Sequence, residues 1–103
     1  MYNLKFLPSA LSDMSEIISY ISNELDNKPA AVRLADKFIE SAERLREFPY
    51  ANAVYVPIKP LKYEYRKAVV ENYLMFYYVS EKEKTVTVSR VIYGRRNYSE
   101  LVK

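Results

Sequence analysis

The chain has 103 residues and neither cysteine nor histidine, which excludes disulfides, thiol nucleophiles, ordinary zinc sites and Ser-His-Asp triads. Its single glycine excludes glycine-rich phosphate-binding loops, and no apolar run is long enough to span a bilayer. The formal net charge is +3, but residues 1–57 hold 6 Lys and Arg against 8 Asp and Glu, whereas residues 58–103 hold 10 against 5. The basic second half also carries seven of the eleven tyrosines, which indicates an anionic partner, nucleic acid first. We expect one domain over residues 1–103, and the missing cysteines and signal peptide favour the cytoplasm.

The first half predicts a short strand and two helices. Residues 2–7 alternate in polarity and end at Pro8, and Ser9 then offers an N-cap with Asp13 and Glu16 early in the helix. Apolar residues at three- and four-residue steps mark the core face of this first helix: Leu11, Met14, Ile17, Ile18, Ile21 and Leu25. After a break at residues 27–29, a second stripe runs to Pro49: Ala31, Leu34, Ala35, Phe38, Ile39, Ala42, Leu45 and Phe48. So short a break predicts an antiparallel helical hairpin.

The second half predicts a meander of strands. Residues 50–61 carry two prolines and indicate an irregular connection. Strands are expected over about 62–70, 73–80 and 85–93, joined by short polar turns. The order predicts an α+β domain, β-α-α-β-β-β, with the helical hairpin packed on one face of a mainly antiparallel sheet. The other face and the strand ends would then be available for function.

The last predicted strand changes the parity of its apolar residues. Val86 and Val88 share one parity, whereas Val91 and Tyr93 lie on the other. Two explanations fit this switch: a bulge near residues 89–90, or a Val91 that packs on the outer face of the sheet.

A turn is expected at Gly94, directly after this strand. Glycine tolerates positive φ and close backbone approach, so a lone glycine at a strand end marks a required turn. The turn would set Arg95 and Arg96 beside Tyr93 and Tyr98. Cations beside aromatic rings suit phosphate and base contact, and they suit an acidic protein equally well. A solvated basic tail is the alternative.

Several segments, taken in order and spacing, resemble the RelE/ParE superfamily of toxins from bacterial toxin–antitoxin modules. They are residues 2–7, 14–21, 45–49, 65–66, 69–73, 76–79 and 90–98. The resemblance implies a small basic toxin that a cognate acidic antitoxin holds inactive, with no metal or organic cofactor. RelE-like members cut mRNA in the ribosomal A site, whereas ParE-like members poison DNA gyrase.

The RelE-like reaction is attack of the RNA 2′-hydroxyl on the adjacent phosphate, which needs a base, an acid and cations on the developing charge. By resemblance, the catalytic candidates are Arg66, Arg96 and Tyr93. The candidates for RNA binding are Lys67, Arg90, Arg95 and Tyr98. The leading hypothesis is therefore a ribosome-dependent mRNA endonuclease.

Two positions depart from the nuclease pattern. Leu74 follows Tyr73 where the best-understood nucleases have arginine, and Val102 stands where they have a terminal catalytic tyrosine. A non-nuclease inhibitor of DNA gyrase, and a degenerate member that only binds its antitoxin, are the alternatives. For Arg66 itself, the structural alternative is a surface ion pair with a neighbouring glutamate.

Overall fold

The structure, a computed structural model, describes residues 1–102. Its elements are β1 (Asn3–Phe6), α1 (Pro8–Ser19), a π-helical turn η1 (Tyr20–Glu24), α2 (Lys28–Leu45), β2 (Arg66–Val70), β3 (Tyr73–Ser80) and β4 (Thr85–Tyr93). The predicted β-α-α-β-β-β order and α+β class are confirmed. The four strands form one sheet in the order β1-β4-β3-β2, with β1 parallel to β4 and the other neighbours antiparallel. Within residues 1–102, no helix is long and apolar enough to cross a membrane.

Helix α1 begins two residues earlier than predicted. Leu7 is its N-cap and Pro8 its first residue, because the fixed φ of proline suits the first helical position. Ser9 is therefore inside the helix, and its hydroxyl donates a 2.6 Å hydrogen bond to the backbone oxygen of Ser89 on β4. The Ser9 N-cap prediction is wrong, and Asp13 lies beyond the first turn and serves a different purpose.

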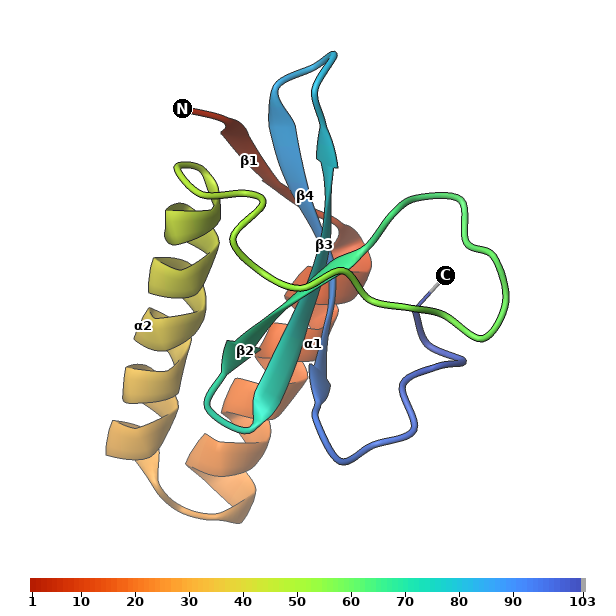
Figure 1. The fold of residues 1–103 in the computed structure, drawn as a ribbon. Coiled ribbons are helices and arrows are strands. Elements are labelled where there is room, and N and C mark those ends of the chain that lie inside the picture. The colour runs from red at the N-terminus through yellow and green to blue at the C-terminus, as the bar shows by residue number, and fades with distance from the viewer. Residues whose placement is uncertain (103) are drawn as a thin grey trace.

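The helical hairpin covers one face of the sheet, with α1 behind the strands and α2 at their side (Figure 1). We call the apolar cluster beneath it the helix-side core, and its buried members include Ala10, Leu34, Phe38, Ala42, Leu45, Met75, Tyr77, Val88 and Val91. The predicted stripes supply much of this core. Four of their residues are more than half exposed, because they lie at the outer margins of the stripes: Leu11, Leu25, Ile39 and Phe48.

The opposite face of the sheet is covered as well. The loop 46–65 and the tail 94–102 pass over it, and the loop crosses in front of the strands in Figure 1. Beneath them lies a second cluster, the loop-side core, whose buried members are Tyr55, Tyr65, Phe76, Ile92 and Val102. The prediction of an open face is wrong, because β3 and β4 carry large apolar side chains on both of their faces.

The parity switch in β4 comes from a bulge. Tyr77 pairs with Val88 and the preceding Phe76 pairs with Arg90, so Ser89 is the extra residue. This confirms the first of the two explanations. The bulge returns Val91 to the helix-side core beside Val88.

Candidate functional site

The turn at Gly94 joins β4 to the hairpin between β2 and β3. The Gly94 N–H donates a 2.8 Å hydrogen bond to the backbone oxygen of Asn72. A Cβ on Gly94 would lie 3.2 Å from that same oxygen, and φ is not positive. Close approach therefore explains the glycine, and the positive-φ explanation is wrong.

The turn presents the predicted cations to solvent. The Arg96 N–H donates to the backbone oxygen of Tyr93, and the Arg95 and Arg96 side chains are exposed. Tyr93 is 42% exposed and packs edge-on against Tyr73 at 5.7 Å between ring centroids. Burial, followed by the neighbouring phenols of Tyr93 and Tyr20, raises the pKa of Tyr73 above its ordinary value, which keeps this ring neutral.

Arg66, the first residue of β2, holds the loop 46–65. Its Nη1 donates to the backbone oxygen of Asn52 at 2.8 Å and to that of Tyr50 at 3.4 Å. Its guanidinium carbon lies 5.0 Å from the centre of the Tyr50 ring, and Nη2 lies 3.6 Å from Glu64. The ion pair with a neighbouring glutamate is thus present, and Nη1 of Arg66 already donates to the loop.

Arg90 holds the tail in the same way. Its Nε and Nη2 bind both carboxylate oxygens of Asp13 at 2.7 and 2.9 Å, and its Nη1 donates to the backbone oxygen of Leu101 at 3.2 Å. Asp13 also accepts from the Val91 N–H, on the stretch of β4 beyond its pairing with β1. The hydrogen bond to Asp13 raises the pKa of Arg90 above its ordinary value. RNA binding by Arg90 stays a prediction, and these contacts assign the side chain a structural task.

Tyr98 and Lys67 lie on the loop-side face. The Tyr98 ring packs against Phe76 and Tyr55, with centroid distances of 5.3 and 5.9 Å. The Lys67 Nζ lies 6.0 Å from the centre of the Tyr55 ring. Their RNA-binding roles are likewise untested predictions.

The structure does not bring the predicted catalytic residues together. Arg66 pairs with Tyr77, whereas Tyr93 pairs with Tyr73 at the other end of β3. Four residues of strand separate these positions by about 13 Å. Arg96 accompanies Tyr93 at that far end, so the candidates form two groups and not one site.

Sequence reasoning missed a polar cluster around Glu81, in the β3–β4 hairpin. Its carboxylate accepts from Tyr2 at 2.6 Å, from Tyr50, and from Lys84 at 2.7 Å. The Lys84 hydrogen bond and then the two phenols lower the pKa of Glu81 to about 2. The bond to Glu81 raises the pKa of Tyr50 to about 12. The cluster ties the beginning of the loop 46–65 to the hairpin, and no short-range pattern in the sequence marks it.

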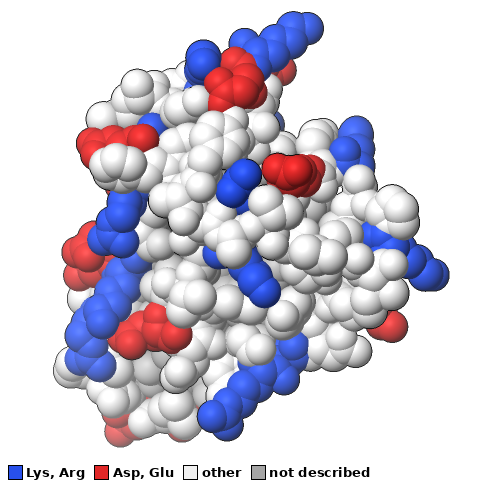
Figure 2. Space-filling view, viewed as in Figure 1, with Lys and Arg blue, Asp and Glu red and all other residues white. Residues whose placement is uncertain are grey.

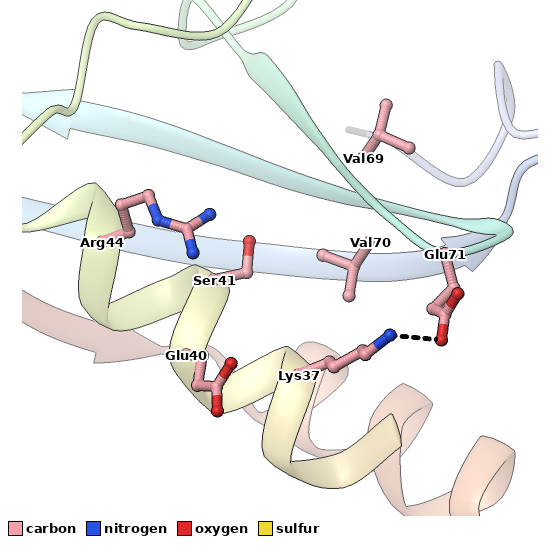
Figure 3. A pocket seen from close by; sticks show the side chains of 7 residues that line it. All are labelled: Lys37, Glu40, Ser41, Arg44, Val69, Val70 and Glu71. Carbon is pink, nitrogen blue, oxygen red and sulfur yellow. Dashed lines mark hydrogen bonds and ion pairs between the residues drawn. The ribbon is translucent and has the colours of Figure 1, made fainter. Parts of the chain in front are cut away.

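A groove runs between α2 and the edge strand β2 (Figure 3). One hollow of about 250 Å³ is lined by Lys37, Glu40, Ser41, Arg44, Val69, Val70 and Glu71, with Lys37 and Glu71 joined by a 2.9 Å ion pair. A second, of about 110 Å³, is lined by Ser41, Arg44, Leu45, Phe48, Ala51, Asn52, Ala68 and Val69. Because the hollows share Ser41, Arg44 and Val69, they form one groove, which we call the β2-edge groove.

Basic side chains follow the same side of the molecule. In Figure 2, Lys and Arg alternate with acidic residues along the side of α2, and more basic side chains lie below the β2–β3 hairpin. Because its charges alternate in sign, this surface suits a partner that carries both signs with a negative excess better than it suits a continuous polyanion.

The sequence matches the family model of the ParE toxin of the type II toxin–antitoxin system parDE over residues 4–98. The chain belongs to the ParE toxin family. This confirms the predicted place in the RelE/ParE superfamily. No curated protein matches the chain by sequence.

Solved structures share the fold of this ParE-family chain at low identity. The chromosomal ParDE system of P. aeruginosa matches at 17% identity and a TM-score of 0.70, covering 90% of this chain and 96% of the other. The RelBE2 complex of Mycobacterium tuberculosis matches at 20% identity and a TM-score of 0.62, covering 89% of this chain and 96% of the other. The intact E. coli RelBE complex matches at 21% identity and a TM-score of 0.54, covering 93% of this chain and 100% of the other. These matches show a shared fold, and a shared fold does not by itself assign a target.

Proposed function

We propose that this ParE-family toxin is neutralised by an acidic antitoxin and acts by binding DNA gyrase, without cleaving mRNA. The observation that carries the proposal is the dispersal of the residues that cleavage would need. This reverses the preference that the sequence alone supported, while keeping the toxin class.

Cleavage by the 2′-hydroxyl needs a base, an acid and a cation within hydrogen-bond reach of one phosphate. Arg66 and Tyr93 lie on opposite sides of β3 and are offset by about 13 Å along the strand direction. Val102, which stands where the nucleases have a tyrosine, is buried in the loop-side core and offers no proton. Leu74, at the other departure, packs against the same core. Binding to gyrase does not require a base, an acid and a cation around one phosphate.

An acidic antitoxin fits the charge distribution of the chain. The second half carries 10 Lys and Arg against 5 Asp and Glu. The similar P. aeruginosa protein is described as part of a ParDE system, and the M. tuberculosis and E. coli proteins as parts of toxin–antitoxin complexes. Charge complementarity would speed association with the antitoxin and exclude basic partners.

One preparation of folded protein, assayed twice, tests the proposal. Purified gyrase should lose supercoiling activity on addition of the protein, while 5′-end mapping in a purified translation system should show intact mRNA. Because Arg96 is exposed beside Tyr93, we expect Arg96→Ala to weaken gyrase inhibition more than Arg33→Ala, a matched exposed arginine on α2.

Ribosome-dependent cuts that disappear in the Arg66→Ala/Arg96→Ala variant would overturn the proposal in favour of an mRNA endonuclease. If the folded protein shows neither gyrase inhibition nor mRNA cleavage, antitoxin binding is its only remaining function.

A further inference from the structure

A small hollow, which we call the tyrosine hollow, lies past the beginning of β2, between the loop 46–65 and the last residues of β3. Its volume is about 160 Å³, and its walls are three tyrosines, a valine and two residues of opposite charge: Tyr50, Tyr63, Tyr78, Val79, Glu64 and Arg66. A cavity of about 150 Å³ holds one benzene molecule, whereas drug-sized ligands occupy about 300–1,000 Å³. The tyrosine hollow therefore has room for one planar ring system and for nothing much larger.

The aromatic walls suit a flat ligand. Tyr63 and Tyr78 stack with 3.9 Å between their ring centroids and 2° between their planes. Tyr63 is 40% exposed and Tyr78 is half-buried, so Tyr63 is the outer ring of the stack. Tyr50 is 48% exposed. Exposed tyrosine rings bind nucleobases by stacking, because every base has an aromatic face.

Glu64 and Arg66 set a carboxylate beside a guanidinium in the same hollow. Nη2 of Arg66 lies 3.6 Å from a Glu64 carboxylate oxygen, while Nη1 donates to the backbone of the loop. The Glu64 side chain is 69% exposed. At 3.6 Å the pair is too long for a hydrogen bond, so the Glu64 oxygens can accept from a ligand and Nη2 can donate to one.

The backbone of Val79 adds a further donor and acceptor. The Lys67 N–H bonds to Ala53 outside the sheet, so the neighbouring pair, Arg66 and Tyr77, directs its backbone groups into the β2–β3 ladder. Alternation directs the Val79 N–H and C=O to the same side as those of Tyr77. Because β2 begins at Arg66, these groups of Val79 face the hollow that Val79 lines. A polar ligand or water must satisfy them.

We propose that the tyrosine hollow binds the guanine base of a nucleotide. Guanine presents an acceptor, O6, next to two donors, N1–H and N2–H₂. Nη2 of Arg66 would donate to O6, and the two Glu64 oxygens would accept from N1–H and N2–H₂. Adenine and cytosine carry only one amino group on this edge, so they would leave one carboxylate oxygen without a partner. The inference does not rest on the proposed function.

Lys62 extends the site toward a phosphate. Its side chain is exposed, and its Nζ lies 5.3 Å from the centre of the Tyr63 ring. Because the hollow holds only the base, the sugar and its phosphate would lie outside it, where Lys62 can meet the phosphate as a point charge. A free guanine nucleotide and a guanine within a single strand share this chemistry.

Saturation-transfer difference NMR of GMP with the full chain tests the base contact. The guanine H8 proton should receive saturation, and GMP should bind at least roughly fivefold more tightly than AMP. Glu64→Gln should remove this preference by weakening GMP and leaving AMP nearly unchanged, because the amide keeps one acceptor and loses the other. Glu24→Gln, at an exposed position on η1, is the matched control.

The stacking contact has its own pair of variants. Tyr63→Leu removes the ring and should weaken GMP and AMP alike, several-fold each, because stacking does not distinguish the bases. Tyr63→Phe keeps the ring and should bind like the wild type. Tyr20→Leu, at a tyrosine 56% exposed on η1, is the control for loss of a surface ring. Circular dichroism and thermal melting confirm that each variant is folded.

The phosphate contact and the source of the guanine are tested together. GMP should bind more tightly than guanosine, and Lys62→Gln should abolish that difference. Tighter binding of the pentanucleotide dT-dT-dG-dT-dT than of GMP would assign the site to single strands, and equal or weaker binding would assign it to a free nucleotide.

Absence of saturation transfer from the folded wild type to GMP, or equal affinity for GMP and AMP, would overturn the site. A Glu64→Gln effect of the same size on both nucleotides would overturn the carboxylate contact. None of these outcomes depends on gyrase or mRNA activity, so the site and the proposed function can fail separately.

Discussion

The two faces of the sheet are closed by different means. On one face, two helices satisfy their own backbone hydrogen bonds and contribute apolar stripes to the helix-side core. On the other, an irregular loop and a tail supply the cover, and their backbone carbonyls need donors from elsewhere. Arg66 provides them for the loop and Arg90 for the tail. An irregular cover over an apolar face is therefore stabilised by long cationic side chains as well as by burial.

The sharpest test of this comparison uses three phenylalanines. Phe38 in the helix-side core is 1% exposed and Phe76 in the loop-side core is 0% exposed. If both clusters are true cores, Phe38→Ala and Phe76→Ala should each lower the free energy of unfolding by about 3–5 kcal/mol in urea denaturation. Phe48→Ala, at a site 57% exposed, is the control and should stay within about 0.5 kcal/mol. A small loss for Phe76→Ala alone would mean that the loop-side cover is loose.

The next test separates the tail from the rest of the molecule. Asp13→Asn removes the charge that orients Arg90 and should lower the free energy of unfolding by about 1–3 kcal/mol. Hydrogen exchange should speed up most at the Leu101 and Val102 amides, whose segment Arg90 holds. Unchanged protection there would refute the tail-holding role. Glu40→Gln, at an exposed position on α2, provides the control.

The smallest effect is expected at the exposed Glu81 cluster, and it depends on pH. Because the folded-state pKa of Glu81 is lowered to about 2, its contribution to stability is present above the ordinary value of 4.5 and is lost as pH falls toward 2. The wild type should therefore melt at a higher temperature than Glu81→Gln at pH 7, and the gap should close on acidification. A gap that stays constant with pH would assign the effect to packing. Glu83→Gln, two residues away, should show no such trend.

Local patterns predicted the helices well because their signal lies within a few residues. The stripe through Leu34 and Phe38 required only helical periodicity, and the parity of Val88 and Val91 left a bulge as one of two explanations. The closure of the second face was not predictable in this way. It depends on Tyr55 and Val102 meeting Phe76 across long stretches of chain.

The roles predicted for individual site residues rest on a weaker signal for a related reason. A basic residue in a strand has the same local signature whether it binds phosphate or a carbonyl of its own chain. Arg66 and Arg90 were singled out by family resemblance, and the structure directs both toward backbone oxygens. The position of β2 at the edge of the sheet follows from the strand order, which the sequence did not specify.

The parallel pairing of β1 with β4 also determines when this protein can fold. Asn3 pairs with Thr85 and Phe6 with Val88, so the first and last strands meet across roughly 80 positions of chain. Contacts this distant in sequence slow folding, because the chain entropy of closing the intervening loop is lost before the sheet is complete. A nascent chain that ends before Thr85 has no partner for β1. The sheet of the toxin therefore cannot assemble until synthesis has passed β4.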